Sequence, residues 1–424
     1  MSNNYIVSRQ HIYFYSKIHI NLNVNKDTAK SNYHLTSQHS HCKQLVLLTL
    51  STFCYMIKEN PKHNQALKGT IMTIIYSFSH FLVDGICALA MFGNFIPRED
   101  GYFLILIYNF CAFALQMPLG VILDFLMEKD KHGTINFSFL SAMLGIIITF
   151  AGAFTHPAIL GIGNALFHAG GGVGTILEDS FENRQGRKLG IFVAPGALGL
   201  YLGTMLAKGG MWKEALLGTG ILSVLLVIWA FNCQRISPPT HTILKMYNID
   251  SDDQNKKNAF SFGTMVSIFC CMTVVILRSC LGMATAFPWK SRALAGALAV
   301  LSIVAGKIAG GFASARYGFQ KTVTISLGLA ACCYLFSDLM PAGLAALFLF
   351  NMTMPITLYW LACCLPKMPG FAFGFLTFAL FLGFLPGYFG LLPQTSRNLI
   401  GCAGSVISLL LLTIMHRWGG FRRT

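Results

Sequence analysis

Long apolar stretches follow one another from Gly69 to His416, separated by short polar segments. A hydrocarbon core about 30 Å thick needs roughly 20 residues of helix, and a helix satisfies its own backbone hydrogen bonds in lipid. We therefore predict an all-α membrane protein with about twelve transmembrane helices. The predicted spans are residues 69–95, 102–126, 136–154, 157–177, 189–207, 213–232, 260–286, 292–314, 322–337, 341–363, 371–392 and 397–416.

Composition agrees with this pattern. Hydrophobic residues make up 54% of the chain and charged residues 11%, against about 25% charged in soluble domains, which excludes a soluble multidomain protein. The net charge of +15 is scattered over loops and tails, so we expect no nucleic-acid partner. The 13 cysteines show no CxxC or metal-ligand spacing, and we interpret them as small core residues. The motifs thus predict no metal and no cofactor.

Loop charge predicts the orientation. Most Lys and Arg residues outside the spans fall in loops on the same side as residue 69, so the positive-inside rule places both ends of the helical region in the cytoplasm. The longest polar interruption, 233–259, follows the sixth span and divides the helices six and six. We expect a multi-pass protein of the cell membrane, in contact with membrane lipids and monomeric.

Five segments follow from these boundaries. They are an N-terminal tail (1–68), an N-terminal six-helix bundle (69–232), a central cytoplasmic loop (233–259), a C-terminal six-helix bundle (260–416) and a basic C-terminal tail (417–424). The N-terminal tail has three interpretations: a disordered tail, an interfacial or signal-like segment around 45–57, or sequence upstream of a start at Met56. We favour the third, because a short basic lead-in follows Met56.

An internal repeat relates the two halves. One offset, the 191 residues from Gly120 to Gly311, also aligns a Pro-Gly-x-x-Gly pattern in the fifth and eleventh helices. The repeats are therefore predicted to be parallel, about an axis along the membrane normal. The pattern would supply a kink and small-residue surfaces that let the bundles rock, or would simply allow tight packing. Its residues are Pro195, Gly196, Gly199, Pro386, Gly387 and Gly390.

The loop after the eighth helix carries a family motif. Residues 311–321, Gly-Phe-Ala-Ser-Ala-Arg-Tyr-Gly-Phe-Gln-Lys, resemble the G-x-x-x-D-R-x-G-x-[RK]-[RK] signature of the major facilitator superfamily, with Ala315 in place of Asp. The first half keeps Gly120 and Asp124 but has Phe125 in place of Arg. In addition, residues 161–168 are similar to the fourth helix of fosmidomycin-resistance exporters. The resemblance implies two six-helix bundles and a cytoplasmic gate formed by Asp124, Lys129, Lys307, Arg316 and Lys321.

Charged residues deep in a membrane helix are functional candidates, because each costs about 2.5–3.5 kcal/mol on insertion. Asp84 lies one helical turn after His80, so the two share a face and can exchange a proton. We predict this pair to be the proton-coupling site. The alternative is a carboxylate near a helix end that faces water.

Three further residues are predicted to bind substrate. Arg278 lies inside the seventh helix, the repeat counterpart of the first, and its guanidinium would bind an anionic group or pair with Asp84. His168 and Asn164 lie in the fourth helix before three consecutive glycines, which permit close helix contact or local unwinding. Glu178, Asp179 and Glu182 are instead interpreted as a solvated loop with local ion pairs.

We therefore predict a secondary transporter of a small organic solute, not an enzyme, that works by alternating access with coupled protons, and we favour export. An intramembrane enzyme acting on a lipid or isoprenoid substrate is the alternative from another class, although the sequence offers only Asp124 and Glu128 as a nearby carboxylate pair. A membrane sensor of the same fold that does not transport would have a similar sequence.

Overall fold

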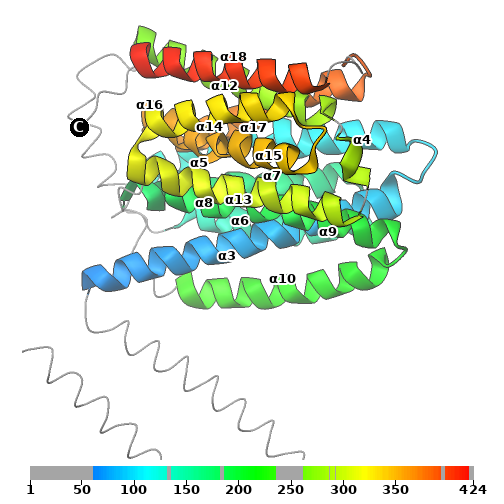
Figure 1. The fold of residues 1–424 in the computed structure, drawn as a ribbon. Helices are drawn as coiled ribbons and strands as arrows, with labels where there is room; N and C mark the ends of the chain where they lie inside the picture. Colours follow the sequence, from blue (N-terminus) through cyan, green and yellow to red (C-terminus); the bar gives the residue numbers. More distant parts are fainter. Residues whose placement is uncertain are drawn as a thin grey trace, which may run out of the picture. The chain divides into compact units, whose positions relative to one another are not determined.

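The computed structural model describes residues 61–130, 135–181, 186–234, 261–285, 287–291, 293–392 and 397–419. The chain divides into two units, residues 1–64 and 65–424. The predictions for the N-terminal tail before residue 61, the central loop 235–260 and residues 420–424 lie outside the described residues. The following account concerns the second unit, whose helices run side by side as long rods (Figure 1).

The first half forms six membrane-spanning segments. The first candidate span is Gly69–Phe95, as predicted, although its helix already begins at Pro61. The second and fifth segments are each built from consecutive shorter helices. In order they are α3 (Pro61–Ala90) with η1 (Met91–Phe95); α4 (Gly101–Asn109), η2 (Phe110–Ala114) and α5 (Gln116–Lys129); α6 (Phe137–Phe154); α7 (Pro157–Phe181); α8 (Arg187–Val193) with α9 (Pro195–Lys208); and α10 (Trp212–Gln234).

The second half repeats this plan. Counted along the whole chain, the tenth segment is divided at Met352, and a short 3₁₀ turn, η3 (Pro288–Ser291), precedes the eighth segment. The segments are α12 (Phe262–Ala284), α13 (Ala293–Tyr317), α14 (Phe319–Leu335), α15 (Met340–Asn351) with α16 (Thr353–Cys364), α17 (Pro369–Tyr388) and α18 (Arg397–Trp418).

Eleven of the described helical segments are long and apolar enough to cross a membrane. The ninth segment, α14, has 17 residues, which is the lower limit for spanning a bilayer. The predicted all-α membrane protein is thus confirmed. One boundary needs correction: α17 ends at Tyr388, so Gly390 lies beyond the helix, in a turn with φ of +69°.

Proline shapes the fifth and eleventh segments differently. Pro195 lacks an N–H and separates α8 from α9, whereas Pro386 lies inside the continuous helix α17. The carbonyl groups at the end of α8 are therefore free to accept hydrogen bonds from elsewhere. This break lies beside the polar cluster described below.

The two halves meet along glycine-lined seams. A Cβ on Gly120 of α5 would overlap the Gly370 carbonyl of α17, and a Cβ on Gly374 would overlap the Gln116 carbonyl. On the other seam, a Cβ on Gly190 of α8 would lie 2.9 Å from the Lys307 carbonyl of α13. Small residues therefore allow the backbones of opposite halves to approach closely.

Candidate functional site

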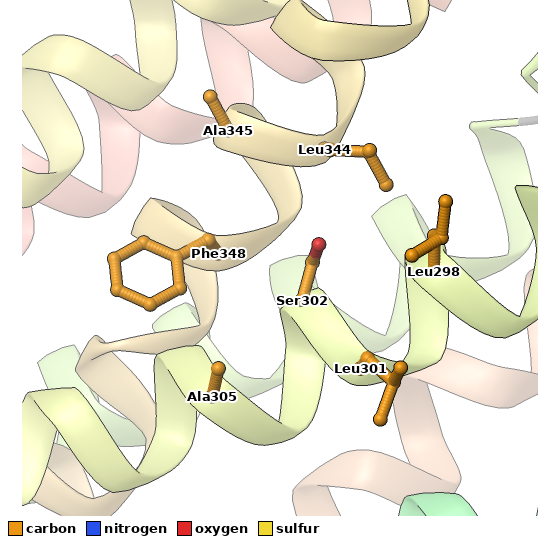
Figure 2. Close-up of a pocket in the computed structure, with 7 residues that line it drawn as sticks. All are labelled: Leu298, Leu301, Ser302, Ala305, Leu344, Ala345 and Phe348. Atoms are coloured by element: carbon orange, nitrogen blue, oxygen red, sulfur yellow. The ribbon is translucent and has the colours of Figure 1, made fainter.

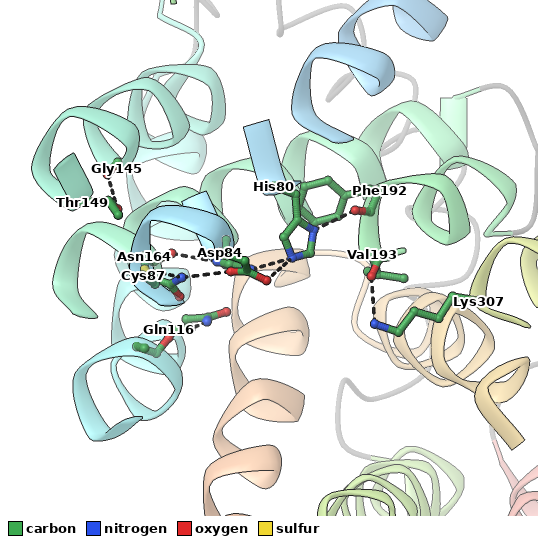
Figure 3. A network of polar contacts seen from close by, with 12 residues as sticks. His80, Asp84, Cys87, Gln116, Gly145, Thr149, Asn164, Phe192, Val193 and Lys307 are labelled. Carbon is green, nitrogen blue, oxygen red and sulfur yellow. Dashed lines mark hydrogen bonds and ion pairs between the residues drawn. The ribbon is translucent and has the colours of Figure 1, made fainter. Parts of the chain in front are cut away.

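A buried polar cluster lies between α3 and α7 in the first half (Figure 3). His80 and Asp84 lie on α3, and the His80 Nε2 is 3.2 Å from the Asp84 Oδ2. His168, from α7, brings its Nε2 to within 2.9 Å of the His80 Nε2 and 3.6 Å of the Asp84 Oδ1. The structure thus joins the pair predicted for proton coupling to a histidine predicted to bind substrate.

The other ring nitrogens fix the tautomers of both histidines. The His80 Nδ1 lies 2.7 Å from the Phe192 carbonyl oxygen, and the His168 Nδ1 lies 2.9 Å from the Asn164 carbonyl oxygen. A carbonyl oxygen only accepts hydrogen bonds, so each Nδ1 carries a hydrogen and donates it. In the neutral imidazoles both Nε2 atoms therefore present lone pairs.

Three acceptors consequently converge on one point: two imidazole nitrogens and the Asp84 carboxylate. Such atoms repel one another unless a cation lies among them. Asn164 supports the carboxylate from the side, since its Nδ2 donates to the Asp84 Oδ1 at 3.2 Å and also lies 3.5 Å from the Cys87 Sγ. The three groups thus form a partly buried polar cluster whose acceptors suit a cation.

Gly196 closes one side of this cluster. A Cβ added to Gly196 would overlap the His80 Nε2 and the Asp84 Oδ2. The sequence suggested that Gly196 contributes to a kink, and it follows Pro195, the first residue of α9. Its missing side chain also makes room for the three acceptors.

The broken fifth segment connects the cluster to the second half. The Phe192 carbonyl accepts from His80, and the next carbonyl, that of Val193, accepts from the Lys307 Nζ of α13 at 3.0 Å. Two successive carbonyls before Pro195 are therefore held by opposite halves. Lys307, predicted to act in gating, makes this contact.

Arg278 lies on α12 in the second half, and its side chain contacts residues of that half. Its Nη2 donates to the Thr353 Oγ1 at the start of α16, and its guanidinium carbon lies 5.9 Å from the centre of the Phe350 ring. The Nε is buried and has no hydrogen-bond partner. The alternative of a direct Arg278–Asp84 pair is not observed, because Asp84 is held by His80, His168 and Asn164.

Asp124 joins the two halves at the end of α5. Its Oδ1 accepts the N–H of Gly370 at 2.8 Å, and its Oδ2 accepts the N–H of Phe371 at 2.7 Å. These are among the first N–H groups of α17, so Asp124 caps a helix of the opposite half. The expected contact between this carboxylate and a facing helix terminus is present.

The cations predicted to share this gate lie elsewhere. The Lys129 Nζ is 5.8 Å from the centre of the Phe125 ring, and the Arg316 guanidinium is 5.7 Å from that of Tyr317. Lys321 is exposed. Backbone N–H groups therefore hold Asp124 where the motif suggested basic side chains.

The acidic end of α7 requires a correction. Asp179 is fully buried rather than solvated, and it accepts the N–H groups of Lys188 at 3.0 Å and Leu189 at 2.7 Å. Glu178 forms an ion pair with Lys188 at 3.3 Å, as expected of a local pair. Glu182 lies outside the described side chains.

The glycines proposed to permit motion pack mainly within each half. A Cβ on Gly199 would overlap the Phe81 carbonyl of α3, and one on Gly387 would meet Met283 of α12. The three glycines after His168 lie in the unbroken helix α7, so they allow close contact without unwinding.

Several contributing groups were not identified from the sequence. The Phe192 and Val193 carbonyls could have been suspected from Pro195, which prevents the regular helical hydrogen-bond pattern. Thr353 and the Tyr102–Tyr388 pair carried no local signal. The two tyrosine rings stack with centroids 4.3 Å apart, and each hydroxyl donates to the other residue's carbonyl oxygen, at 3.0 and 2.9 Å.

A groove of about 400 Å³ lies between α13 and α15 (Figure 2). Ser302 contributes its polar atom, and the remaining lining is apolar: Leu298, Leu301, Ala305, Leu344, Ala345 and Phe348. The groove contains none of the charged residues above. It is therefore distinct from the polar cluster of His80, Asp84 and His168.

Comparison with known proteins was informative only at the level of structure. No protein-family model matches the chain, and no curated protein sequence matches it. The E. coli fucose:proton symporter FucP aligns with a TM-score of 0.52 at 10% identity, over 82% of this chain and 98% of the symporter. FucP in its outward conformation gives 0.50 at 11% identity, over 80% and 99%.

A human protein has the same architecture. The human organic anion transporter TETRAN aligns with a TM-score of 0.51 at 12% identity, over 84% of this chain and 100% of that protein. The chain thus has the fold of major facilitator superfamily transporters, as the motif resemblance indicated. At these identities the comparison establishes the fold alone.

Proposed function

We propose that the protein is a secondary transporter that moves a small organic solute by alternating access of its two six-helix halves. The observation that carries the proposal is the clustering of His80, Asp84 and His168 between α3 and α7. A buried carboxylate in a membrane helix is costly and usually marks an ion or substrate pathway.

The coupling ion in this proposal is the proton, held by Asp84 and His80 with His168 as a third acceptor. A proton among these groups neutralises their repulsion, and its release would change the contacts of α3 with α7 and with the Phe192 carbonyl. The neighbouring Val193 carbonyl is bound by Lys307 of the other half. The fifth segment therefore offers a physical route from the cation site to the contact between halves.

The solute in this proposal carries an anionic group. Arg278 offers a buried guanidinium whose described contacts are a hydroxyl and a ring, so its charge is available to a carboxylate or phosphate. Asn164 and His168 line the first half at the cation site. One structural neighbour is named as an organic anion transporter, which supports this class of solute. Another is named as a fucose:proton symporter, which supports proton coupling.

The rival enzyme hypothesis receives less support from the geometry. Of the two carboxylates the sequence offered, Asp124 is used as a helix cap and Glu128 is exposed. We propose that the protein works as a monomer among membrane lipids and that it favours export.

Asp84→Asn tests the coupling role. The amide keeps the shape of the side chain but removes the negative charge, so gradient-driven transport should be abolished while expression stays intact. Uptake into proteoliposomes under an imposed proton gradient measures this, with the exposed Asp100→Asn as the matched control. Normal gradient-driven transport by Asp84→Asn would remove Asp84 from the mechanism.

Arg278→Lys tests the anionic solute. Lysine keeps the positive charge but loses the planar fork that binds an oxyanion through two donors. We expect the KM for an anionic solute to rise about tenfold, because the variant loses one charge-assisted hydrogen bond to the solute. The KM should be unchanged in the control variant Arg98→Lys, whose side chain is exposed. An unchanged KM in Arg278→Lys would contradict direct solute binding by Arg278.

A further inference from the structure

We propose that His80, Asp84 and His168 also form a binding site for a divalent transition-metal ion such as Zn²⁺. The metal site stands on the geometry of the cluster, whereas the effect on transport described below rests on the proposed function. Two imidazole nitrogens and one carboxylate oxygen form a donor set that suits first-row transition metals.

The spacing of the donor atoms fits a single ion. The two Nε2 atoms lie 2.9 Å apart, the Asp84 Oδ2 lies 3.2 Å from the His80 Nε2, and the Asp84 Oδ1 lies 3.6 Å from the His168 Nε2. One donor atom from each of the three residues lies within 4.8 Å of the other two. Ligand atoms bound at about 2.1 Å lie about 3.0 Å apart in octahedral geometry and about 3.4 Å apart in tetrahedral geometry. A rotation of the carboxylate and small side-chain movements would therefore bring the three donors to the distances that a metal needs.

The surrounding hydrogen bonds orient the three donors. A metal-binding histidine usually donates its second ring N–H to a carbonyl or carboxylate, which directs the other nitrogen at the ion. Both histidines do this here, through the Phe192 and Asn164 carbonyls. Asn164 also orients the carboxylate by donating to the Asp84 Oδ1. Contacts of this kind hold the ligands of a metal site in position and raise their basicity.

A further oxygen is present next to the cluster. Asn164 is 2% exposed, and its Oδ1 is buried without a hydrogen-bond partner, although an unsatisfied buried acceptor is costly. The Asn164 amide therefore has an unused acceptor while its nitrogen holds Asp84. Gly196, which has no side chain, packs directly against His80 and Asp84. The cluster thus offers three oriented donors that are enclosed by neighbouring helices.

The position of the site predicts its effect. All three ligands belong to the first half, so a bound metal would tie α3 to α7 and hold the His80 imidazole, which contacts the Phe192 carbonyl of the broken fifth segment. The ion would occupy the position proposed for the coupling cation. We infer that such metals arrest the transporter rather than drive it.

Metal binding is measured directly on the full chain, purified in detergent without a polyhistidine tag. Titration with Co²⁺ reports coordination through its visible absorption, and titration with Zn²⁺ gives the stoichiometry and affinity. His168→Ala removes one ligand, whereas His156→Ala removes an exposed histidine of the same half. Binding by other histidines and by cysteines is common to both variants and cancels in the comparison.

We expect His168→Ala to bind one metal fewer per chain, or to bind it at least about tenfold more weakly, while His156→Ala matches the unmodified protein. Asn164→Ala, which keeps all three donors, should weaken binding about 10- to 100-fold. X-ray absorption of the Zn²⁺ complex should show imidazole ligands at about 2.0 Å. Equal stoichiometry, affinity and Co²⁺ spectra in folded His168→Ala and His156→Ala would overturn the proposal.

The same preparations separate this inference from the transport function. A protein that binds the metal through His168 but moves no solute would support the metal site and count against the transporter. Proton-coupled transport that is unaffected by His168-dependent Zn²⁺ binding would overturn the inferred arrest.

Discussion

Gly196 shows how one missing side chain shapes the site. A methyl group on the Cα of Gly196 would overlap the His80 Nε2 and the Asp84 Oδ2. Any larger residue at this position must therefore displace one of these groups. Buried groups of this kind are held at close distances by surrounding packing, and the interior resists added volume. The identity of residue 196 thus matters for chemistry as well as for helix geometry.

Gly196→Ala should therefore disturb the cluster although it removes no polar atom. We expect destabilisation of about 1–3 kcal/mol from overpacking, together with loss of coupled transport. Gly218→Ala on α10 is the matched control, because a Cβ there has no neighbour within 4 Å. Thermal unfolding in detergent and proteoliposome uptake measure the two effects. Equal behaviour of the two variants would show that Gly196 does not support the cluster.

Helix ends carry the polar contacts between elements. Asp124 caps α17 from the opposite half, Asp179 caps α8 from α7, and the free carbonyls at the end of α8 bind His80 and Lys307. Each contact satisfies backbone groups that a helix leaves unpaired at its terminus. Such contacts are directional and form only in one relative position of the helices, so they are suited to a conformational latch.

Asp124→Ala should weaken this latch. Loss of an N-capping carboxylate costs about 0.5–2 kcal/mol, and α17 would lose its bond to α5. We expect a lower thermal midpoint in detergent than for Glu128→Ala, which removes an exposed carboxylate from the same helix. If the two variants unfold at the same temperature, Asp124 does not stabilise the contact between the halves.

On the scale of the whole molecule, the second membrane segment and α17 link the halves at both of their ends. The Tyr102–Tyr388 pair joins the start of α4 to the end of α17, while Asp124 joins the end of α5 to the start of α17. Alternating access requires the halves to separate on one side and then on the other. At least one of these two contacts must open during the cycle.

Cross-linking tests this movement. A short bifunctional thiol reagent joining Tyr102→Cys to Tyr388→Cys would hold that end of the seam closed, since the native rings lie 4.3 Å apart. We expect transport by the treated double variant to fall to the level of empty liposomes. Each single variant, treated identically, should keep its activity and thereby controls for reaction at native cysteines. Full activity after complete cross-linking would mean that the seam stays closed throughout the cycle.

The sequence predicted the fold well because its signals are local. The lengths of the apolar stretches predicted the membrane spans, and the 191-residue offset that aligns Gly120 with Gly311 indicated two related halves. It also placed His80 and Asp84 on one helical face, where the structure has them 3.2 Å apart. Each of these inferences needs only helical periodicity and the thickness of a bilayer.

The remainder of the site depended on contacts distant in sequence. His168 meets His80 across 88 residues, and Asp124 meets Gly370 across 246, distances over which helical periodicity carries no information. The motif placed Asp124 at a gate but suggested cations as its partners, whereas the partners are backbone N–H groups of a helix that no local pattern could identify. The orientation of α3 against α7 and of α5 against α17 is set by packing of the whole molecule.

Proton movement in proteoliposomes tests the central claim most directly. The purified chain is reconstituted, a proton gradient is imposed, and internal pH is followed while organic anions and amphiphiles are added in turn. The account predicts a solute whose addition moves protons in the unmodified protein and in Asp100→Asn but not in Asp84→Asn. Solute-dependent proton movement that persists in Asp84→Asn, or solute flux with no proton movement in any variant, would contradict it.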